Sequence, residues 1–212
     1  LIIQNQIVKE HNLFIKTSGW LPLVEHEKIP VYFSPNDVIK GDGIMALSEE
    51  QILDKNIQLQ PQVPWVSFFN IRQFGDLYSD NFTFETQIKN NFREGSGICQ
   101  FSEIHLLYEE GAVIIPLSIK GCVSELTFYD SNGKKENPVA FGVDFSDWVD
   151  VKLHFKGHQG NIYINHELAY TTNYNFPPKK IVGVRYRFQG TGSVNSITLS
   201  KGSGEVLYTE SF

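Results

Sequence analysis

Two glutamates, Glu85 and Glu103, are the pair of acids that would support acid–base chemistry if their strands were neighbours in a β-sheet. Each falls on an outward position of its predicted strand. On neighbouring strands their carboxyl groups would lie within the ~5–9 Å that glycoside hydrolysis uses. The alternative, which we favour, is that they are solvated or paired across strands with Arg185 or Arg187.

Other catalytic signatures are missing from the sequence. There is no Gly-x-Ser-x-Gly nucleophile turn, no His-Glu-x-x-His zinc motif and no Walker phosphate loop. The sequence therefore predicts no catalytic residue, and we lean against an enzyme while leaving the question open.

One segment, Asp130-Ser131-Asn132-Gly133, is similar to the start of a calcium-binding loop. No acid follows at the position that binds calcium through both oxygens. Asn-Gly favours the positive φ angles of a primed hairpin turn, which explains the segment better. We expect no cofactor, with a structural calcium ion as the alternative.

Polar residues alternate with apolar ones along three predicted strands near the C-terminus. The outward positions are expected to form one polar sheet face, made of His154, Tyr163, Arg185 and Arg187. An aromatic ring beside planar polar groups suits the apolar face and the hydroxyls of a sugar. These four residues, with Glu85 and Glu103, are the candidate ligand-binding set. The alternative is an ordinary solvated face with cross-strand ion pairs.

The elements that must position these residues are strands. From Trp65 onward, apolar residues alternate with period two and turn residues recur every 8–12 residues, as in a β-sandwich or barrel. In 82–89 the core side is expected to carry Phe82, Phe84, Thr86 and Ile88. In 149–155 it is expected to carry Val149, Val151, Leu153 and Phe155. In 181–188 it is expected to carry Val182, Val184, Tyr186 and Phe188.

The first third is less regular. Ser34-Pro35-Asn36-Asp37 predicts one helical turn, and the capping box Ser48-Glu49-Glu50-Gln51 predicts a short helix near 49–55. Short edge strands are expected at 2–3, 7–8 and 13–15. We expect one domain over 1–212, with 1–64 as edge strands and excursions and 65–212 as the main sandwich.

Charge and apolar content limit the partners. A formal net charge of −6 argues against a nucleic-acid partner. No apolar run approaches the ~20 residues of a membrane-spanning helix. The chain begins with Leu1, which indicates a processed or trimmed product. Cys99 and Cys122 are either two buried thiols, which we favour, or one disulfide, which would indicate an oxidising compartment.

Three passages, 81–88, 148–165 and 188–208, resemble the concanavalin A-like lectin/glucanase jelly rolls, including their laminin-G-like members. They are Asn81-Phe82-Thr83-Phe84-Glu85-Thr86-Gln87-Ile88, the hairpin from Trp148-Val149-Asp150 to Tyr163-Ile164-Asn165, and the closing segments around Gly190-Thr191-Gly192 and Tyr208. The resemblance implies two large curved sheets, with glycan on the concave face or at loop tips. The family's glycanases carry Glu-x-Asp-x-x-Glu. This sequence lacks that motif, its nearest approach being Glu103-Ile104-His105.

The expected fold is therefore an all-β, two-sheet antiparallel jelly-roll sandwich with one or two short helices in the N-terminal third. The expected function is a non-catalytic carbohydrate- or surface-binding module of an exported protein, with a glycan or cell-surface ligand and an extracytoplasmic location. The alternatives are a glycoside hydrolase or glycan lyase on the same fold, or a structural protein-interaction domain.

Overall fold

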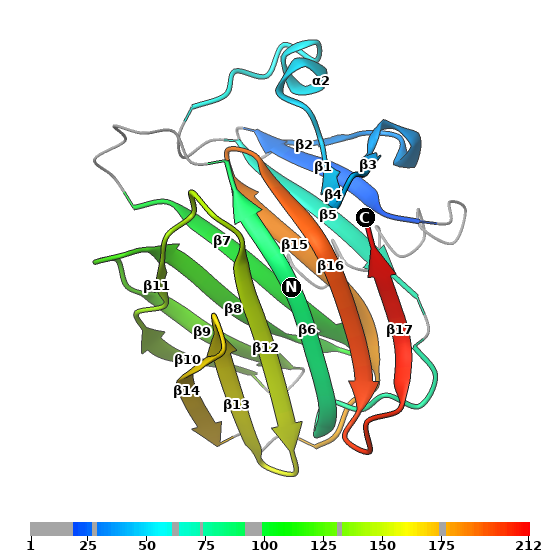
Figure 1. Cartoon of the computed structure of the whole chain (residues 1–212), viewed down its shortest axis with the longest axis vertical. Helices are drawn as coiled ribbons and strands as arrows, with labels where there is room; N and C mark the ends of the chain where they lie inside the picture. The colour runs from blue at the N-terminus through cyan, green and yellow to red at the C-terminus, as the bar shows by residue number, and fades with distance from the viewer. Residues whose placement is uncertain are drawn as a thin grey trace.

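The computed structural model describes residues 19–26, 29–60, 64–72, 74–91, 99–130, 133–173 and 177–212. Over these residues two β-sheets face each other as the layers of a sandwich (Figure 1). The longer strands pair with antiparallel neighbours, and the helical elements are two short segments near the N-terminal side. The predicted all-β jelly-roll sandwich is confirmed.

The sheet that lies behind in Figure 1 is called the first sheet. Across it the order is β10 (Gly133–Val139), β9 (Ser124–Asp130), β8 (Gly111–Ile119), β7 (Phe101–Tyr108), β15 (Ile181–Gln189), β5 (Trp65–Ile71), β1 (Leu21–His26) and β2 (Ile29–Tyr32). The short β11 (Gly142–Val143) pairs in parallel with β8.

The sheet in front is called the second sheet. Across it the order is β14 (Glu167–Asn173), β13 (Gln159–Ile164), β12 (Val149–Lys156), β6 (Asn81–Asn90), β16 (Gly192–Lys201), β4 (Ile44–Ala46) and β3 (Ile39–Gly41). The last strand, β17 (Val206–Ser211), pairs with β16 (Figure 1).

The core lies between the sheets and follows the predicted alternation. The inward side chains of β6 and β12 are buried, and Phe82 stacks on Phe155 with ring centroids 4.9 Å apart. Burying a side chain of this size stabilises the fold by about 1.5–3 kcal/mol. Because alternate residues of a strand point to opposite faces, the same burial directs Glu85 and His154 away from the core.

One strand departs from its predicted phase. In β15 the pairing with β7 shifts between Ile181 and Gly183, which is a β-bulge at Val182. Ile181 is therefore in the main core, and Val182 packs against the separate apolar cluster that contains Leu107 and Phe69, on the opposite side of the sheet. The prediction that Val182 shares the core side with Val184 is wrong, because the extra residue reverses the alternation.

The helical predictions are confirmed. Ser34 caps a 3₁₀ turn, η1 (Pro35–Asp37). Ser48 caps α2 (Glu49–Leu53), where Ser48 Oγ accepts from Gln51 N at 3.1 Å and Gln51 Oε1 accepts from Ser48 N at 2.9 Å. The edge strands predicted at 2–3, 7–8 and 13–15 lie outside the described residues.

The two cysteines form a disulfide, Cys99–Cys122. The preference for free thiols is therefore wrong. Cys99 precedes β7 and Cys122 follows β8, and because these strands pair antiparallel, their ends bring the two cysteines together. The hairpin predicted at 130–133 is confirmed by the pairing of β9 with β10, in which Asp130 lies opposite Gly133.

Candidate functional site

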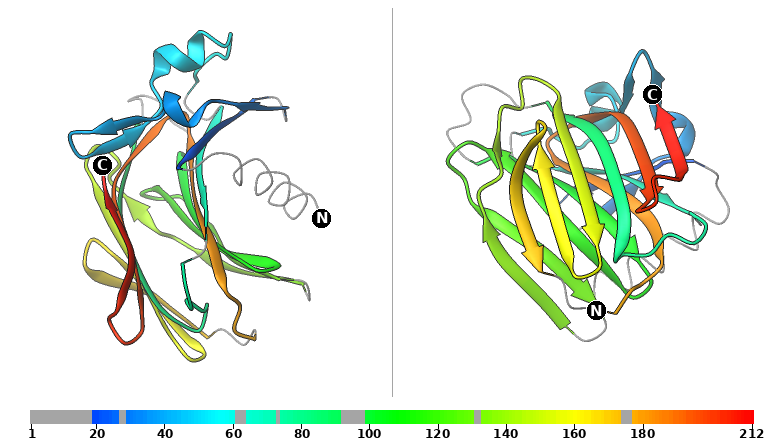
Figure 2. Two further views of the ribbon diagram at one scale, coloured as in Figure 1. Left: turned by 90° about the vertical axis from the view of Figure 1, so that its right-hand side faces the viewer. Right: turned by 60° about the horizontal axis from the view of Figure 1, so that its bottom comes forward.

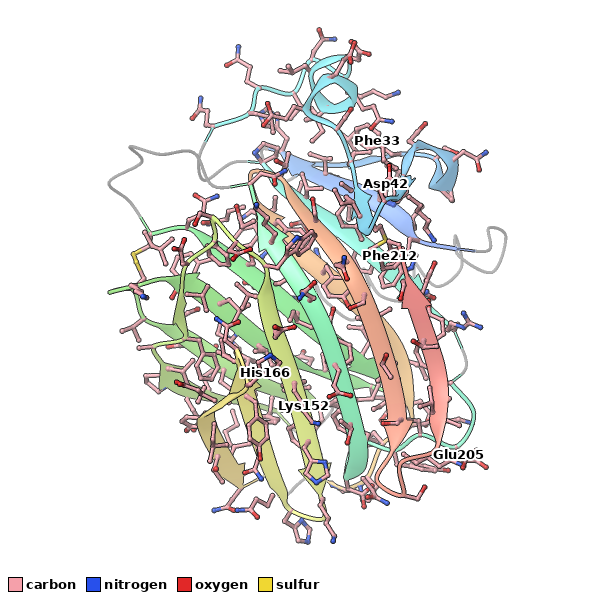
Figure 3. All side chains as sticks on the ribbon, viewed as in Figure 1. Phe33, Asp42, Lys152, His166, Glu205 and Phe212 are labelled. Atoms are coloured by element: carbon pink, nitrogen blue, oxygen red, sulfur yellow. A yellow bond between two sulfur atoms is a disulfide. The ribbon has the colours of Figure 1, made fainter. Side chains whose placement is uncertain are left out.

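The outward face of the second sheet carries a groove of about 600 Å³. Figure 3 looks onto this face and labels Lys152 and His166. Strand alternation assembles the groove, because it comes from outward positions of β6, β12, β13 and β16. Its polar lining includes Glu85, Asp150, Lys152, His154, Tyr163, His166 and Thr198.

A row of outward residues crosses the strands in register. Glu85 lies opposite Thr198 on one side and Lys152 on the other, and Lys152 lies opposite Tyr163. Tyr163 in turn faces Leu168 of the edge strand β14, and Leu168 is 56% exposed. Lys152 Nζ is 2.9 Å from Glu85 Oε1. The row thus begins with the hydroxyl group of Thr198 and the charged groups of Glu85 and Lys152. It ends with the aromatic ring of Tyr163 and the apolar side chain of Leu168.

His154 is held in the groove by one ring nitrogen. Its Nδ1 is 3.0 Å from Thr83 Oγ1 on the neighbouring strand. This hydrogen bond orients the imidazole and engages Nδ1, so Nε2 is the nitrogen that would contact a ligand.

The turn between β13 and β14 supplies the groove with a residue that sequence reasoning missed. Asn165 and His166 both have positive φ angles, 50° and 68°, as in a two-residue type I′ hairpin. Asn165 is tied to β12, since its N donates to Asp150 O at 2.9 Å and its Oδ1 accepts from Asp150 N at 3.0 Å. His166 Nε2 then lies 3.4 Å from Asp150 Oδ2. Recognising a two-residue hairpin loop at 165–166 in the sequence would have identified His166 as a candidate.

Asp150 is the second groove acid. Its Oδ1 accepts from Gln87 Nε2 at 3.2 Å. Because Val149, Val151 and Leu153 point into the core, alternation along β12 directs Asp150 and Lys152 outward beside His154, although the predicted candidate set does not include them. Both line the groove.

The candidate set is divided between two opposite faces of the sandwich. His154, Tyr163 and Glu85 belong to the second sheet and line the groove. Arg185, Arg187 and Glu103 belong to β15 and β7 of the first sheet and point to its outward side. The expectations that these histidine, tyrosine and arginine residues share one face, and that Glu85 and Glu103 lie on neighbouring strands, are therefore wrong. Alternation along a strand predicts that a side chain points outward, but it does not predict which of the two sheets the strand joins.

On the first sheet both arginines are engaged by Glu25. Glu25 Oε1 is 2.9 Å from Arg185 Nη2, and Glu25 Oε2 is 2.7 Å from Arg187 Nη2. Each guanidinium also lies over an aromatic ring, Arg187 over Trp65 at 3.8 Å and Arg185 over Phe69 at 4.5 Å. This network ties β1, β5 and β15 together.

Glu103 and His105 extend the network. Glu103 Oε2 is 3.1 Å from Arg187 Nη1 and 2.9 Å from His105 Nε2. Burial opposes ionisation of Glu103, but its hydrogen bond with His105 and the nearby positive charge outweigh burial and lower its pKa to about 2. Burial lowers the pKa of His105 below its ordinary 6.5, more than Glu103 raises it. The cross-strand pairing of Glu103 with Arg187 that we favoured is present.

No group of three or more His, Cys, Asp or Glu side chains that could hold a metal ion occurs within the described ranges. In the same part of the chain, no helix is long and apolar enough to cross a membrane.

No protein-family model and no curated protein matches this chain. Among solved structures, it is similar to the carbohydrate-binding module CBM66 from Bacillus subtilis, with 10% identity, 68% of this chain and 90% of that chain covered, and a TM-score of 0.49. Sheep galectin-11, in complex with glycerol, has 6% identity, 62% and 96% coverage and a TM-score of 0.47. A Bacillus licheniformis β-glucanase has 11% identity, 77% and 81% coverage and a TM-score of 0.48.

These neighbours are the kinds of protein that the resemblance to lectin/glucanase jelly rolls predicted. At such identities the likeness concerns the arrangement of strands and assigns no ligand. The two-sheet antiparallel fold is established by the chain's own strand order and pairing.

Proposed function

We propose that this chain is a non-catalytic module that binds a glycan in the groove of the second sheet. One observation carries the proposal. The groove, about 600 Å³ in volume, combines a half-buried tyrosine beside an exposed leucine with a row of polar side chains across four strands. Small-molecule sites of about 300–1,000 Å³ have this mixture of apolar surface and a few convergent polar groups.

The polar row suits sugar hydroxyls, which both donate and accept hydrogen bonds. Glu85 accepts, Lys152 donates and Thr198 does both, so neighbouring hydroxyls of one sugar find either kind of partner. Tyr163 and Leu168 offer apolar surface for the C–H face of a sugar ring. Recognition by these groups needs no metal or cofactor.

Glycoside hydrolysis is the second candidate, because Glu85 and Asp150 share the groove. Glu85 lies opposite Lys152, two residues along β12 from Asp150, so the two acids are diagonal neighbours. Diagonal neighbours lie roughly 7–8 Å apart, a spacing compatible with the ~6.5–9.5 Å between the carboxyl groups of inverting hydrolases.

The partners of these acids favour binding over hydrolysis. Glu85 is paired with the Lys152 ammonium at 2.9 Å. Asp150 accepts a hydrogen bond from Gln87 and faces His166, so both carboxyl groups are already engaged by neighbouring side chains.

The proposal includes an extracytoplasmic location and a cell-surface or secreted glycan as ligand. The Cys99–Cys122 disulfide supports this location, because disulfides persist mainly in oxidising compartments.

A glycan array followed by calorimetry with the best ligand tests the proposal. Tyr163→Ala should weaken binding by about fivefold or more, the effect of losing one aromatic contact. The matched control is Tyr78→Ala, since Tyr78 is 44% exposed and outside the groove. An array without any bound glycan, or equal losses in the two variants, would refute groove binding.

Incubating the same ligands with the protein and analysing the products separates the two candidates. We expect no cleavage. If the protein cleaves a ligand, and if Glu85→Gln and Asp150→Asn each abolish the cleavage, hydrolysis replaces the binding proposal.

A further inference from the structure

The open edge of the sandwich beside β17 contains a second cavity, of about 470 Å³, here called the edge pocket. Figure 2 (left) looks at this edge, with β17 on one side and the first sheet on the other. Its lining includes Trp20, Lys40, Asn70, Arg72, Tyr208 and Glu210. None of these residues lines the groove.

Strand register turns polar residues of β17 toward the first sheet. Tyr208 lies opposite the core residue Leu199, and Glu210 lies opposite the core residue Ile197. From the first sheet, Asn70 follows the inward phase of Phe68 and is 3% exposed. The pocket is therefore a polar opening at the end of an otherwise apolar core.

The floor of the edge pocket is held rigidly around Glu210. Glu210 Oε2 accepts from Trp20 Nε1 at 2.8 Å and from Tyr208 Oη, and Glu210 Oε1 accepts from Lys40 Nζ at 2.7 Å. Asn70 Nδ2 donates to Tyr208 Oη at 3.1 Å. Burial alone would raise the pKa of Glu210, but the three donated hydrogen bonds outweigh burial and lower it. Glu210 is thus a fixed anion that positions Lys40.

Cations outnumber anions in this lining. Among the described residues it has two cations, Lys40 and Arg72, and one anion, Glu210, which leaves one positive charge. Arg72 is exposed, and its guanidinium lies over the Tyr208 ring at 4.6 Å and the Phe74 ring at 5.9 Å. This cation–π contact with Tyr208 restrains the guanidinium, whose planar fork of N–H donors matches a carboxylate.

We propose that the edge pocket binds the carboxylate of an acidic sugar, such as a uronic acid unit, with Arg72 as the bidentate partner. Lys40 is paired with Glu210, so the net positive charge of the lining is that of Arg72. Glu210 repels a carboxylate from the floor, and the charged group therefore stays at the rim beside Arg72. The sugar ring lies toward the Tyr208 side of the pocket. This site is separate from the groove, and its occupation does not depend on glycan binding there.

Calorimetric titration of the intact protein with glucuronate and with glucose tests this proposal. We expect glucuronate to bind and glucose, which has the same ring without the carboxylate, to bind at least about tenfold more weakly, as for the loss of a charge-assisted pair. Equal binding of the two sugars, or no binding of glucuronate, would overturn the proposal. Acetate binding as tightly as glucuronate would overturn the assignment to an acidic sugar.

Variants locate the site. Arg72→Gln should weaken glucuronate binding about tenfold or more. Lys156→Gln removes the same charge from an exposed position on β12 and should leave binding unchanged. Tyr163→Ala should also leave glucuronate binding unchanged, so failure of the groove proposal and failure of the edge-pocket proposal remain distinct. Binding that persists in Arg72→Gln, or is lost in Tyr163→Ala, would place the carboxylate elsewhere.

Discussion

His166 Nε2 lies 3.4 Å from Asp150 Oδ2 in the lining of the groove, and His166 has a left-handed backbone conformation. A non-glycine residue with positive φ is uncommon and costs on the order of 1 kcal/mol. Glycine would adopt this backbone conformation at a lower free-energy cost. The histidine at this position instead presents an imidazole to the groove.

Replacing this residue separates folding from binding. His166→Gly should leave the free energy of unfolding within about 1 kcal/mol of the parent, because glycine accepts the positive φ. The same change should weaken glycan binding, since it removes a side chain from the groove. Chemical denaturation and calorimetry measure the two effects. A strongly destabilised variant would contradict the expectation for folding, and a variant that binds as well as the parent would contradict a role of His166 in binding.

Glu25 is expected to be important for stability, because its carboxylate contacts both Arg185 and Arg187. Glu25→Gln removes the charge that compensates two largely buried guanidinium groups and should cost about 2–4 kcal/mol. The control is Glu205→Gln, whose partner is Lys201 and whose side chain is 58% exposed. That change should cost less than about 1 kcal/mol. Similar losses for the two variants in urea unfolding would contradict this role.

The His105 environment makes stability depend on pH. Its pKa is lowered in the folded protein, so the unfolded chain binds a proton more readily. The stabilisation is complete above the ordinary pKa of 6.5 and is lost as the pH falls through that value toward the folded pKa. We therefore expect the free energy of unfolding to decrease between pH 7.5 and 5. His105→Gln should flatten this part of the profile, and an unchanged slope in the variant would assign the dependence to another group.

The Cys99–Cys122 disulfide should contribute substantially to stability. It joins residues 23 positions apart, and closing a loop of that length restricts the unfolded chain by about 3 kcal/mol. Unfolding in the presence of a reductant should therefore show a loss of about this size. Cys99→Ser with Cys122→Ser should show the same loss and no further response to reductant. A parent protein whose unfolding curve ignores the reductant, after reduction is verified by mass spectrometry, would contradict this expectation.

Local sequence determined the elements and most of the side-chain directions. Alternation placed Phe82 and Phe155 in the core and His154 and Tyr163 outside, and the Ser48–Gln51 capping box specified the start of α2. These features depend on residues within a few positions of one another, so they can be read along the chain.

Tertiary structure decided which outward residues meet. The pairing of β15 with β5 and β7 places Arg185 and Arg187 on the first sheet, far from the groove that they were expected to share. Pairing of β6 with β12 and β16 brings Glu85, Asp150 and Thr198 together from segments more than forty residues apart. Sheet membership depends on which distant strands exchange backbone hydrogen bonds, and a period of two is the same whichever sheet a strand joins. The sequence alone therefore determined a two-sheet sandwich with polar outer faces, whereas the groove, the arginine network and the disulfide were decided by long-range pairing.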